Sequence, residues 1–283
     1  MVREDLRQFS REQQTAFWRK VMRNILLRLA YDGTNYHGFQ RQPEEHGPTV
    51  QGELERTWKK LFAEEIRIVT AGRTDTGVHA AGQVINFRAE ASIPREKISK
   101  AMNSILPFDI RILEAEDVSE GFDARKFARW KRYDYRIDNS RIPDVFSRLY
   151  SLHEPTPLNV GDMQLAAFHL QGRHDFKAFA AAGSSAKSFV RTLCHCKIGR
   201  QKNQIIVTCI GDGFLYNMVR IIAGTLIYVG KGRIIHTDIP EIIQSRDRTK
   251  AGKTVAARGL TLTYVNYDGT KPSNIFADIE KPD

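Results

Sequence analysis

The chain has 283 residues, and its 43 lysines and arginines against 33 aspartates and glutamates give a formal charge of +10. Apolar residues make up 41% and charged residues 27%, which is the composition of a folded globular protein and excludes an intrinsically disordered chain. The longest apolar run, 214–229, is interrupted by Asn217 and Arg220, so membrane insertion is also excluded.

The cysteine count and the charge indicate where the protein works and what it binds. Three cysteines are too few for a disulfide framework, and residues 1–20 lack the apolar core of a secretory signal. We therefore expect a reducing, cytoplasmic location. The positive charge favours a polyanionic partner, with nucleic acid ahead of an anionic membrane surface.

The first half of the chain predicts elements in the order β-α-β-β-α-β. Residues 1–23 are a polar extension, and the aliphatic segment 24–31 that follows ends at Asp32-Gly33, as a strand before a turn does. Leu54, Trp58 and Leu61 lie at helical spacing and predict a helix over 51–62. Further along we predict strands at 66–71, 78–87 and 109–113 and a helix at 96–105.

The second half predicts a similar order. Residues 127–137 alternate apolar and basic side chains, as a half-exposed strand does. After a proline-containing connection we predict helices at 163–170, 214–229 and 238–245 and strands at 189–200, 204–210 and 260–267. Two similar α+β halves that share one sheet or one cleft follow from this pattern, with a boundary near 122–128.

The loop after the strand at 66–71 is the most unusual segment. Gly72 and Gly77 bracket a sharp excursion of the backbone, with Asp75 at its tip and Arg73 beside it. A carboxylate held at a loop tip can act as a nucleophile when a cation keeps it ionised. It can equally form an Asx turn by bonding its own backbone. The residue spacing leaves both interpretations open.

Arg220 lies among apolar residues, where a guanidinium should be desolvated and in need of a partner. One interpretation pairs it with a carboxylate of the other half, and Asp75 is the natural candidate. The other lets its long side chain reach the surface.

Residues 125–136 gather six basic and four aromatic side chains in twelve positions. Basic groups such as Lys131 and Arg132 reach phosphates, and aromatic faces stack on exposed bases. Because Tyr133 and Tyr135 share one strand face, we expect at least one of them to be part of the core.

The other motifs give weaker evidence for a function. Cys194 and His195 are neighbours on a predicted strand and point to opposite faces, so they do not converge on a zinc ion. The sequence has no P-loop, dinucleotide-binding glycine motif or nucleophile elbow. We therefore predict neither a metal nor a nucleotide cofactor.

Four stretches in order resemble the TruA family of tRNA pseudouridine synthases, over about residues 24–268. They are 31–42 (YDGTNYHGFQRQ) with Val50-Gln51 behind it, 72–79 (GRTDTGVH) with Gly82-Gln83, 122–125 (FDAR) leading to 132–135 (RYDY), and 214–220 (FLYNMVR) with Gly224. Thr76 stands where many members of the family have Ala. The Arg-Thr-Asp-x-Gly-Val-His motif is specific, and it decides the interpretation of Asp75 in favour of chemistry.

The resemblance implies the pseudouridine synthase fold, an α+β fold. In it, two similar α/β halves share a mixed, largely antiparallel sheet with helices on its outer face and a central active-site cleft. It divides the chain into an N-terminal extension (1–23), an N-terminal half with the Asp75 loop (24–125), a C-terminal half (126–268) and a tail (269–283).

The resemblance also implies the activity: uridine becomes pseudouridine at positions 38, 39 and 40 of the tRNA anticodon stem-loop. Asp75 is the expected nucleophile, Tyr133 the tyrosine that stacks on the flipped-out base, Arg220 the ion-pair partner of Asp75, and Arg73 the arginine that helps to hold the flipped-out state. The family uses no metal or organic cofactor and acts as a homodimer, with one tRNA contacting both subunits.

Two other functions remain as alternatives. A non-catalytic RNA-binding or RNA-chaperone module would share the basic charge and the aromatic strip, but would not need Arg73, Asp75 and Arg220 together. A glycosidase-like hydrolase would need a second carboxylate near Asp75, such as Asp32, and would release free uracil.

Overall fold

The computed structural model of the chain describes residues 22–90, 92–184 and 186–269. The predicted extension 1–23 and tail 269–283 lie almost wholly outside the described residues. In the described ranges, no helix combines the length and the apolar character that a bilayer span requires.

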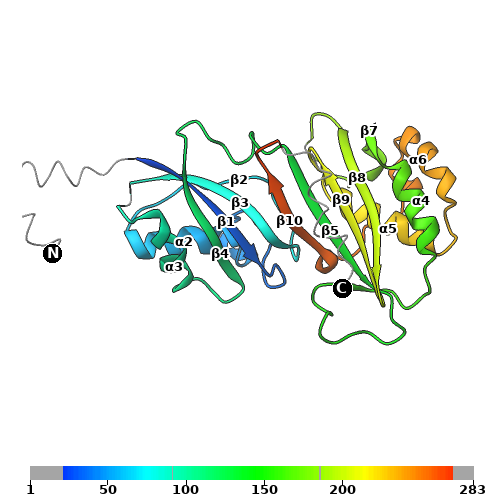
Figure 1. Cartoon of the computed structure of the whole chain (residues 1–283), viewed down its shortest axis with the longest axis horizontal. Coiled ribbons are helices and arrows are strands. Elements are labelled where there is room, and N and C mark those ends of the chain that lie inside the picture. The colour runs from blue at the N-terminus through cyan, green and yellow to red at the C-terminus, as the bar shows by residue number, and fades with distance from the viewer. Residues whose placement is uncertain (1–21, 91, 185, 270–283) are drawn as a thin grey trace, which may run out of the picture.

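A ten-stranded sheet forms the centre of the protein. Eight strands lie side by side in the order β4-β1-β3-β10-β5-β9-β8-β7, while β2 pairs with β3 and β6 pairs with β5 (Figure 1). The strands are β1 (Arg23–Tyr31), β2 (Val69–Thr70), β3 (His79–Ala89), β4 (Ile110–Val118), β5 (Trp130–Asp138), β6 (Leu152–His153), β7 (Gly172–Asp175), β8 (Val190–Gln201), β9 (Gln204–Gly211) and β10 (Leu260–Asn266).

The sheet is mixed and largely antiparallel. Among the strand pairs of the described residues, only β10 with β3 and β5 with β6 are parallel. Together with the five α-helices of the described residues, this sheet confirms the predicted α+β fold class. The helices are α2 (Val50–Phe62), α3 (Arg95–Asn103), α4 (Val160–His169), α5 (Met218–Gly230) and α6 (Ile239–Ser245).

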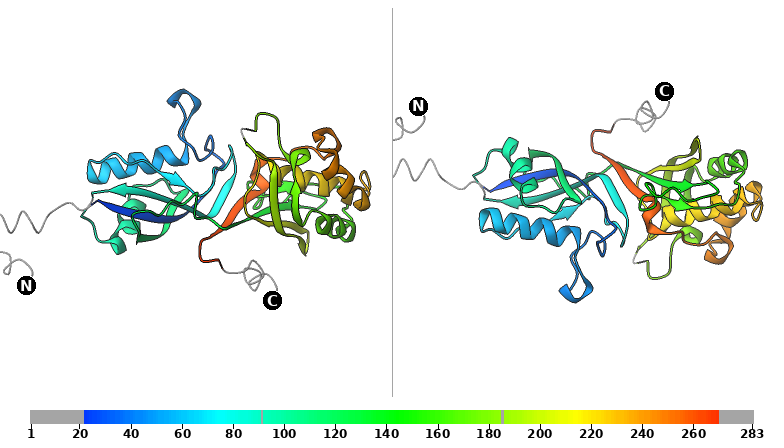
Figure 2. Two further views of the ribbon diagram at one scale, coloured as in Figure 1. Left: turned by 90° about the horizontal axis from the view of Figure 1, so that it is seen from above. Right: turned by 90° about the horizontal axis from the view of Figure 1, so that it is seen from below.

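The N-terminal half buries one face of its strands beneath α2. Ile25 and Leu27 of β1 are fully buried and lie opposite Phe87 and Ile85 of β3, so all four side chains share one face. Trp58 of α2 packs edge-on against Phe87, with the ring centroids 4.7 Å apart. The segment between β1 and α2, blue in Figure 2, projects away from the sheet.

The C-terminal half is built around α5, whose residues are nearly all buried. The chain segment after α6 crosses this helix so closely that a Cβ on Gly224 would clash with the carbonyl oxygen of Lys253. The Thr225 hydroxyl accepts a 2.9 Å hydrogen bond from Gly252 N at the same crossing. Glycine at 224 therefore lets the segment 251–255 lie against the first turns of α5.

The last strand joins the two halves. In β10, Leu262 lies opposite Ala80 of the parallel strand β3 and opposite Tyr133 of the antiparallel strand β5. Tyr31 of β1 is the partner of Ala80 on the other side. Tyr31, Ala80, Leu262 and Tyr133 therefore form one row across four adjacent strands, on the face that also carries α2.

The predicted elements are all present, but some of their bounds differ. The expected strand 66–71 is paired only at Val69–Thr70, and α5 begins at Met218 rather than at 214 because Asn217 has a left-handed backbone (φ 58°). The short strands β6 and β7 were not predicted. The division of the chain at 125 remains a prediction, because β10 runs in the middle of one continuous sheet.

Candidate active site

The Asp75 loop, residues 71–78, runs from β2 to β3. Its turn is closed by a 3.1 Å hydrogen bond from Val78 N to the Asp75 carbonyl oxygen, and Gly77 follows in the left-handed region (φ 75°). The Asx turn, the alternative that the residue spacing left open, is not formed in the described residues, because the backbone and not the side chain of Asp75 closes the turn. In the described part of the chain the Asp75 carboxylate accepts no hydrogen bond, so its oxygens are available to a substrate.

The loop is clamped from the side of β1. Tyr31 OH lies 2.7 Å from Thr74 Oγ1, and Phe39 N donates a 3.0 Å hydrogen bond to the Thr74 carbonyl oxygen. Gly38 has φ +85°, and a Cβ there would lie 2.9 Å from the same oxygen. The residue that precedes Asp75 is thus fixed by both its side chain and its backbone.

A fully buried glutamine of β3, Gln83, also holds the Asp75 loop in place. Gln83 Nε2 donates to the Gly72 carbonyl oxygen at 2.8 Å and to Tyr31 OH at 3.3 Å. Gln83 Oε1 accepts from Val84 N at 3.1 Å. One side chain therefore connects the beginning of the Asp75 loop to the tyrosine that holds its middle.

The environment of Asp75 makes its carboxylate more basic. Burial raises the pKa of the Asp75 carboxyl, and the positive charge of Arg220 limits the rise. A carboxylate that is desolvated, free of hydrogen bonds and still attracted by a cation is a better nucleophile than a solvated one.

Arg220 is held in place by other groups. From the first turn of α5, its Nε donates to the Val255 carbonyl oxygen at 2.7 Å and its Nη1 to Asn217 Oδ1 at 2.6 Å. Within the described residues it forms no direct ion pair with Asp75, so the two interact through the electric field alone. The structure thus brings Arg220 near Asp75, at a longer range than the predicted contact pair.

Tyr133 faces the same region. Its side chain is 7% exposed, and its ring packs edge-on against Phe214 with centroids 5.0 Å apart. Burial, with smaller contributions from Tyr31 and Asp75, raises the pKa of Tyr133 well above its ordinary value. Its phenol is therefore neutral at physiological pH, and it donates no hydrogen bond to any described residue. Tyr135 is the core member of the pair, since its OH donates to the Ala256 carbonyl oxygen at 2.8 Å.

Three basic residues named from the sequence have different positions. Arg73 is exposed on the Asp75 loop. Lys131 lies beside that loop, with Nζ 3.5 Å from the place that a Cβ on Gly72 would occupy. Arg132 lies on the opposite face of β5 and forms a bidentate ion pair with Asp134, at 3.0 and 2.9 Å. The structure therefore brings Arg73 and Lys131, but not Arg132, to the side of Asp75.

Asp32, the second carboxylate of the hydrolase alternative, accepts hydrogen bonds through both of its oxygens. It accepts hydrogen bonds from Thr34 N at 2.9 Å, from Thr34 Oγ1 at 2.6 Å and from Tyr150 OH at 2.7 Å. Burial raises the pKa of Asp32, but these hydrogen bonds outweigh burial and hold the pKa below its ordinary value. An ionised, hydrogen-bonded carboxylate is a poor general acid.

His79, the last residue of the motif, connects both halves. Its Nδ1 accepts from Gly33 N at 3.0 Å, while Nε2 lies 3.1 Å from the carbonyl oxygens of Leu149 and of Arg258. From the sequence, His79, Tyr31 and Gln83 were recognised only as members of the family motifs, without a role of their own. The one sign of their role was their place in those motifs, since an apolar strand gives no reason for a buried glutamine or histidine.

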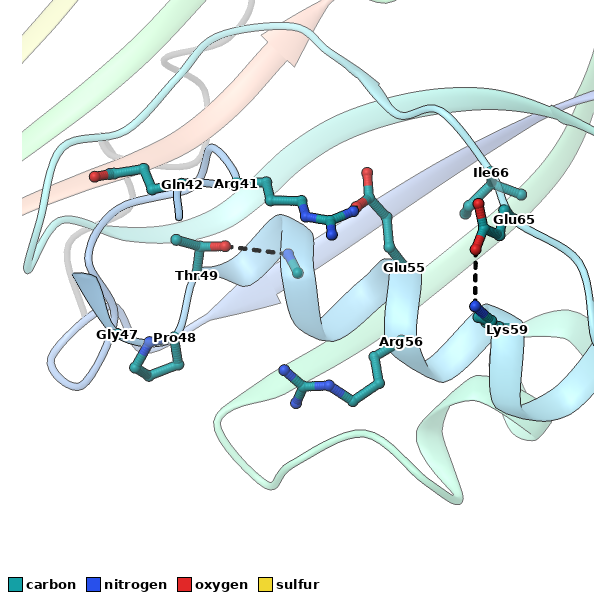
Figure 3. A pocket seen from close by; sticks show the side chains of 11 residues that line it. Arg41, Gln42, Gly47, Pro48, Thr49, Glu55, Arg56, Lys59, Glu65 and Ile66 are labelled. Atoms are coloured by element: carbon teal, nitrogen blue, oxygen red, sulfur yellow. Dashed lines mark hydrogen bonds and ion pairs between the residues drawn. The ribbon is translucent and has the colours of Figure 1, made fainter. Parts of the chain in front are cut away.

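A surface cavity of about 290 Å³ lies along α2, and its lining includes none of Asp75, Tyr133 and Arg220 (Figure 3). Each of its basic side chains is paired with a carboxylate: Arg41 with Glu55 at 3.2 Å, Lys59 with Glu65 at 2.7 Å and Arg56 with Glu53 at 2.7 Å. We therefore assign no chemistry to this cavity.

Several known proteins are similar to this chain in sequence. Residues 29–125 and 166–268 match the protein family described as tRNA pseudouridine synthase. The "tRNA pseudouridine synthase A" of Moorella thermoacetica is 52% identical over 243 residues, which cover 86% of this chain and 99% of the relative. Proteins of the same name from a Thermoanaerobacter species (46%) and from Brevibacillus brevis (44%) align over 246 residues, 87% of this chain and 100% of each relative. The first family segment contains the Asp75 loop and the second contains Arg220, while Tyr133 lies between them.

Proposed function

The chain belongs to the TruA family of tRNA pseudouridine synthases, which are isomerases, and from this premise we propose which uridines it converts and how. The proposed targets are uridines 38, 39 and 40 of the tRNA anticodon stem-loop, and the proposed nucleophile is Asp75. The anticodon positions come from the resemblance to the family. The observation that supports the nucleophile is the half-buried, unbonded carboxylate of Asp75 beside Arg220 and Tyr133.

The isomerisation exchanges one bond to the ribose for another. The N1–C1′ glycosidic bond breaks, the uracil turns, and a C5–C1′ bond forms, while the proton on C5 is lost and N1 gains one. Asp75 attacks either C1′ of the ribose or C6 of the uracil, and on both routes the covalent bond that its carboxylate forms to the substrate is broken again on the way to pseudouridine, so the carboxylate is regenerated. No electrons leave the substrate, so the reaction needs neither a redox partner nor a nucleotide triphosphate.

The neighbouring residues prepare Asp75 for this reaction. Arg220 keeps the buried carboxylate ionised and offers no hydrogen bond that would have to be broken before attack. Tyr133, a neutral phenol with its hydroxyl unengaged by described residues, stacks on the extruded uracil and takes part in removing the proton at C5. Arg73 is exposed on the same loop, where it can fill the space of the displaced base or contact its phosphate.

The target base must leave the helical stack before Asp75 can reach it, at a cost of a few kcal/mol. The net charge of +10 supports phosphate contacts that offset this cost. We also propose that the protein acts as a homodimer in the cytoplasm, as the family resemblance implies; its mass in solution, measured by light scattering with and without tRNA, tests the dimer.

One assay separates the proposed function from its alternatives. Unmodified tRNA transcripts that carry a single uridine at 38, 39, 40 or 55 are incubated with the protein and then digested for nucleoside mass spectrometry. Pseudouridine from the first three transcripts and not from the fourth supports the proposal. Free uracil would indicate a hydrolase, and bound but unchanged tRNA would indicate a non-catalytic RNA-binding module.

A further inference from the structure

The face of β5 that carries Tyr133 also carries a lysine, Lys131. Lys131 lies two residues before Tyr133, so the two side chains point to the same face about 6.6 Å apart along the strand. In the described part of the chain, Lys131 Nζ forms neither a hydrogen bond nor an ion pair, although the side chain is largely buried.

The Lys131 side chain lies against the Asp75 loop. Gly211 is the register partner of Lys131 on β9 and presents no side chain. Gly72 of the Asp75 loop approaches from the other side, where a Cβ would lie 3.5 Å from Nζ and 3.7 Å from Cε. The ammonium group of Lys131 therefore lies against the backbone that leads to Asp75.

The positive charges of two arginines from other elements act on the same ammonium group. Arg191 of β8 is fixed by hydrogen bonds from Nη1 to the carbonyl oxygens of Ser188 (3.0 Å) and Val190 (2.6 Å). Arg125, from the loop before β5, is exposed, and its guanidinium donates no hydrogen bond to a described residue. Among the described residues, Asp212 is the one acidic group whose charge acts on Lys131 together with these two arginines.

Such a cluster is electrostatically unfavourable in the free protein. Burial, together with the positive charges of Arg125 and Arg191 and against the opposing effect of Asp212, lowers the pKa of Lys131 to about 8. Three cations that gather around a single carboxylate are stabilised by an added anion. Phosphate is the anion that a nucleic-acid substrate brings to this place.

We propose that Lys131, Arg125 and Arg191 form a binding site for a backbone phosphate next to the target uridine. The site rests on the proposed function for the identity of its ligand, since a base stacked on Tyr133 would bring its flanking phosphates to this part of the face. It differs from the sequence-based expectation, which paired Lys131 with Arg132. Arg132 points away, and the site instead takes one arginine from before β5 and one from β8.

The first test compares two lysines of the full-length protein. Lys131→Gln removes the proposed contact, and Lys97→Gln, an exposed lysine of α3 at the opposite side of the sheet, is the matched control. For Lys131→Gln we expect Kd and KM for tRNA to rise about tenfold at low salt with little change in kcat, because a phosphate contact stabilises ground state and transition state alike. The slope of log Kd against log salt should fall by about one, and Lys97→Gln should leave it unchanged.

The second test removes the phosphate instead of the lysine. A neutral methylphosphonate replaces the phosphate on the 5′ or on the 3′ side of the target uridine. At one of these two positions, the methylphosphonate should raise the Kd of the wild-type protein by the same factor as Lys131→Gln raises the Kd for unmodified tRNA. Lys131→Gln combined with this methylphosphonate should raise Kd no more than either change alone. Arg125→Gln, an exposed change that leaves the fold intact, should show the same lack of additivity.

Titration gives a third readout. The Kd of the wild-type protein should rise as the pH passes through about 8, where free Lys131 loses its proton, while Lys131→Arg should bind with a Kd that is constant across this range. Fully additive losses, or a salt slope unchanged by Lys131→Gln, would overturn the site. If no pseudouridine forms but the losses are non-additive, the proposed function fails and the phosphate site remains.

Discussion

Arg220 acts on Asp75 without touching it: its guanidinium donates to the Val255 carbonyl oxygen and to Asn217 Oδ1, while its charge lowers the pKa of the buried carboxyl. This arrangement separates two tasks that a contact ion pair would combine. The hydrogen bonds fix the cation, and the carboxylate keeps its lone pairs for the substrate.

The first prediction concerns the pH dependence of turnover. Asp75 must be ionised to attack, so kcat falls as the pH drops through its pKa. Arg220→Gln removes the charge that opposes the effect of burial, so the pKa should rise further and the acidic limb of the kcat profile should move to higher pH. Profiles measured by single-turnover pseudouridine formation test this.

Arg220→Lys is the control for this prediction. It keeps a positive charge but loses the paired contacts to Val255 and Asn217, so the acidic limb should stay near that of the wild-type protein while the melting temperature falls. If Arg220→Gln left the limb where it is, the charge of Arg220 would not act on Asp75.

The second prediction concerns the backbone beneath the Asp75 loop. Gly38→Ala forces a Cβ to within 2.9 Å of the Thr74 carbonyl oxygen at a φ of +85°, so residue 74 must shift and move Asp75 with it. Gly183→Ala has nearly the same strain, with φ +81°, but meets no atom within 4 Å. Both should lower the free energy of unfolding by about 1–3 kcal/mol, and only Gly38→Ala should also lower kcat. Equal kcat values for the two variants would mean that the contact does not position Asp75.

The third prediction concerns Gln83. Gln83→Leu leaves the Gly72 carbonyl oxygen and the Val84 amide without their side-chain partner in the core, which should cost about 1–3 kcal/mol in the free energy of unfolding. Because Gln83 only positions the loop, kcat should fall while the Kd for tRNA stays constant. Tyr31→Phe removes the contacts of its hydroxyl to Thr74 and Gln83 but keeps the hydrogen bond from Gln83 to Gly72, so its stability loss should be smaller, about 0.5–1.5 kcal/mol. A change in Kd without a change in kcat would contradict the positioning role.

The fourth prediction separates Arg132 from tRNA binding. Arg132 and Asp134 are 15% and 5% exposed, so breaking their ion pair with Arg132→Gln should cost about 3–5 kcal/mol of folding free energy. The double change Arg132→Gln with Asp134→Asn should recover part of this loss. The salt dependence of tRNA binding by the folded variant should equal that of the wild-type protein. A flatter slope would restore Arg132 as a phosphate contact.

Much of the fold could be predicted from local patterns, because strands such as β1 and helices such as α2 are marked by the spacing of their own apolar residues. The position of β10 could not be predicted in this way. Its parallel register with β3, Thr261 opposite His79, joins distant parts of the chain and leaves no local signal. The predicted start of α5 at residue 214 is too early, because nothing in the apolar run indicates the left-handed backbone at Asn217.

The candidate active site could likewise be predicted from the sequence only in part. The resemblance to the TruA family singled out Asp75, Arg73, Arg220 and Tyr133, but the sequence could not tell a contact pair from an interaction at a distance between Asp75 and Arg220. Neighbouring residues Lys131 and Arg132 were grouped by charge, although strand alternation puts them on opposite faces. Which face meets the Asp75 loop is set by the pairing of β5 with β10 and β9, and that pairing is a property of the whole sheet.

The most direct test of the central claim uses Asp75→Asn, which keeps the shape of the side chain and removes its charge. Purified variant and wild-type protein are incubated with a transcript bearing uridine 39, and pseudouridine and bound tRNA are measured in the same samples. We predict that the variant binds tRNA with the affinity of the wild-type protein and forms no pseudouridine. Pseudouridine formation by Asp75→Asn at a rate near that of the wild-type protein would show that Asp75 is not the nucleophile.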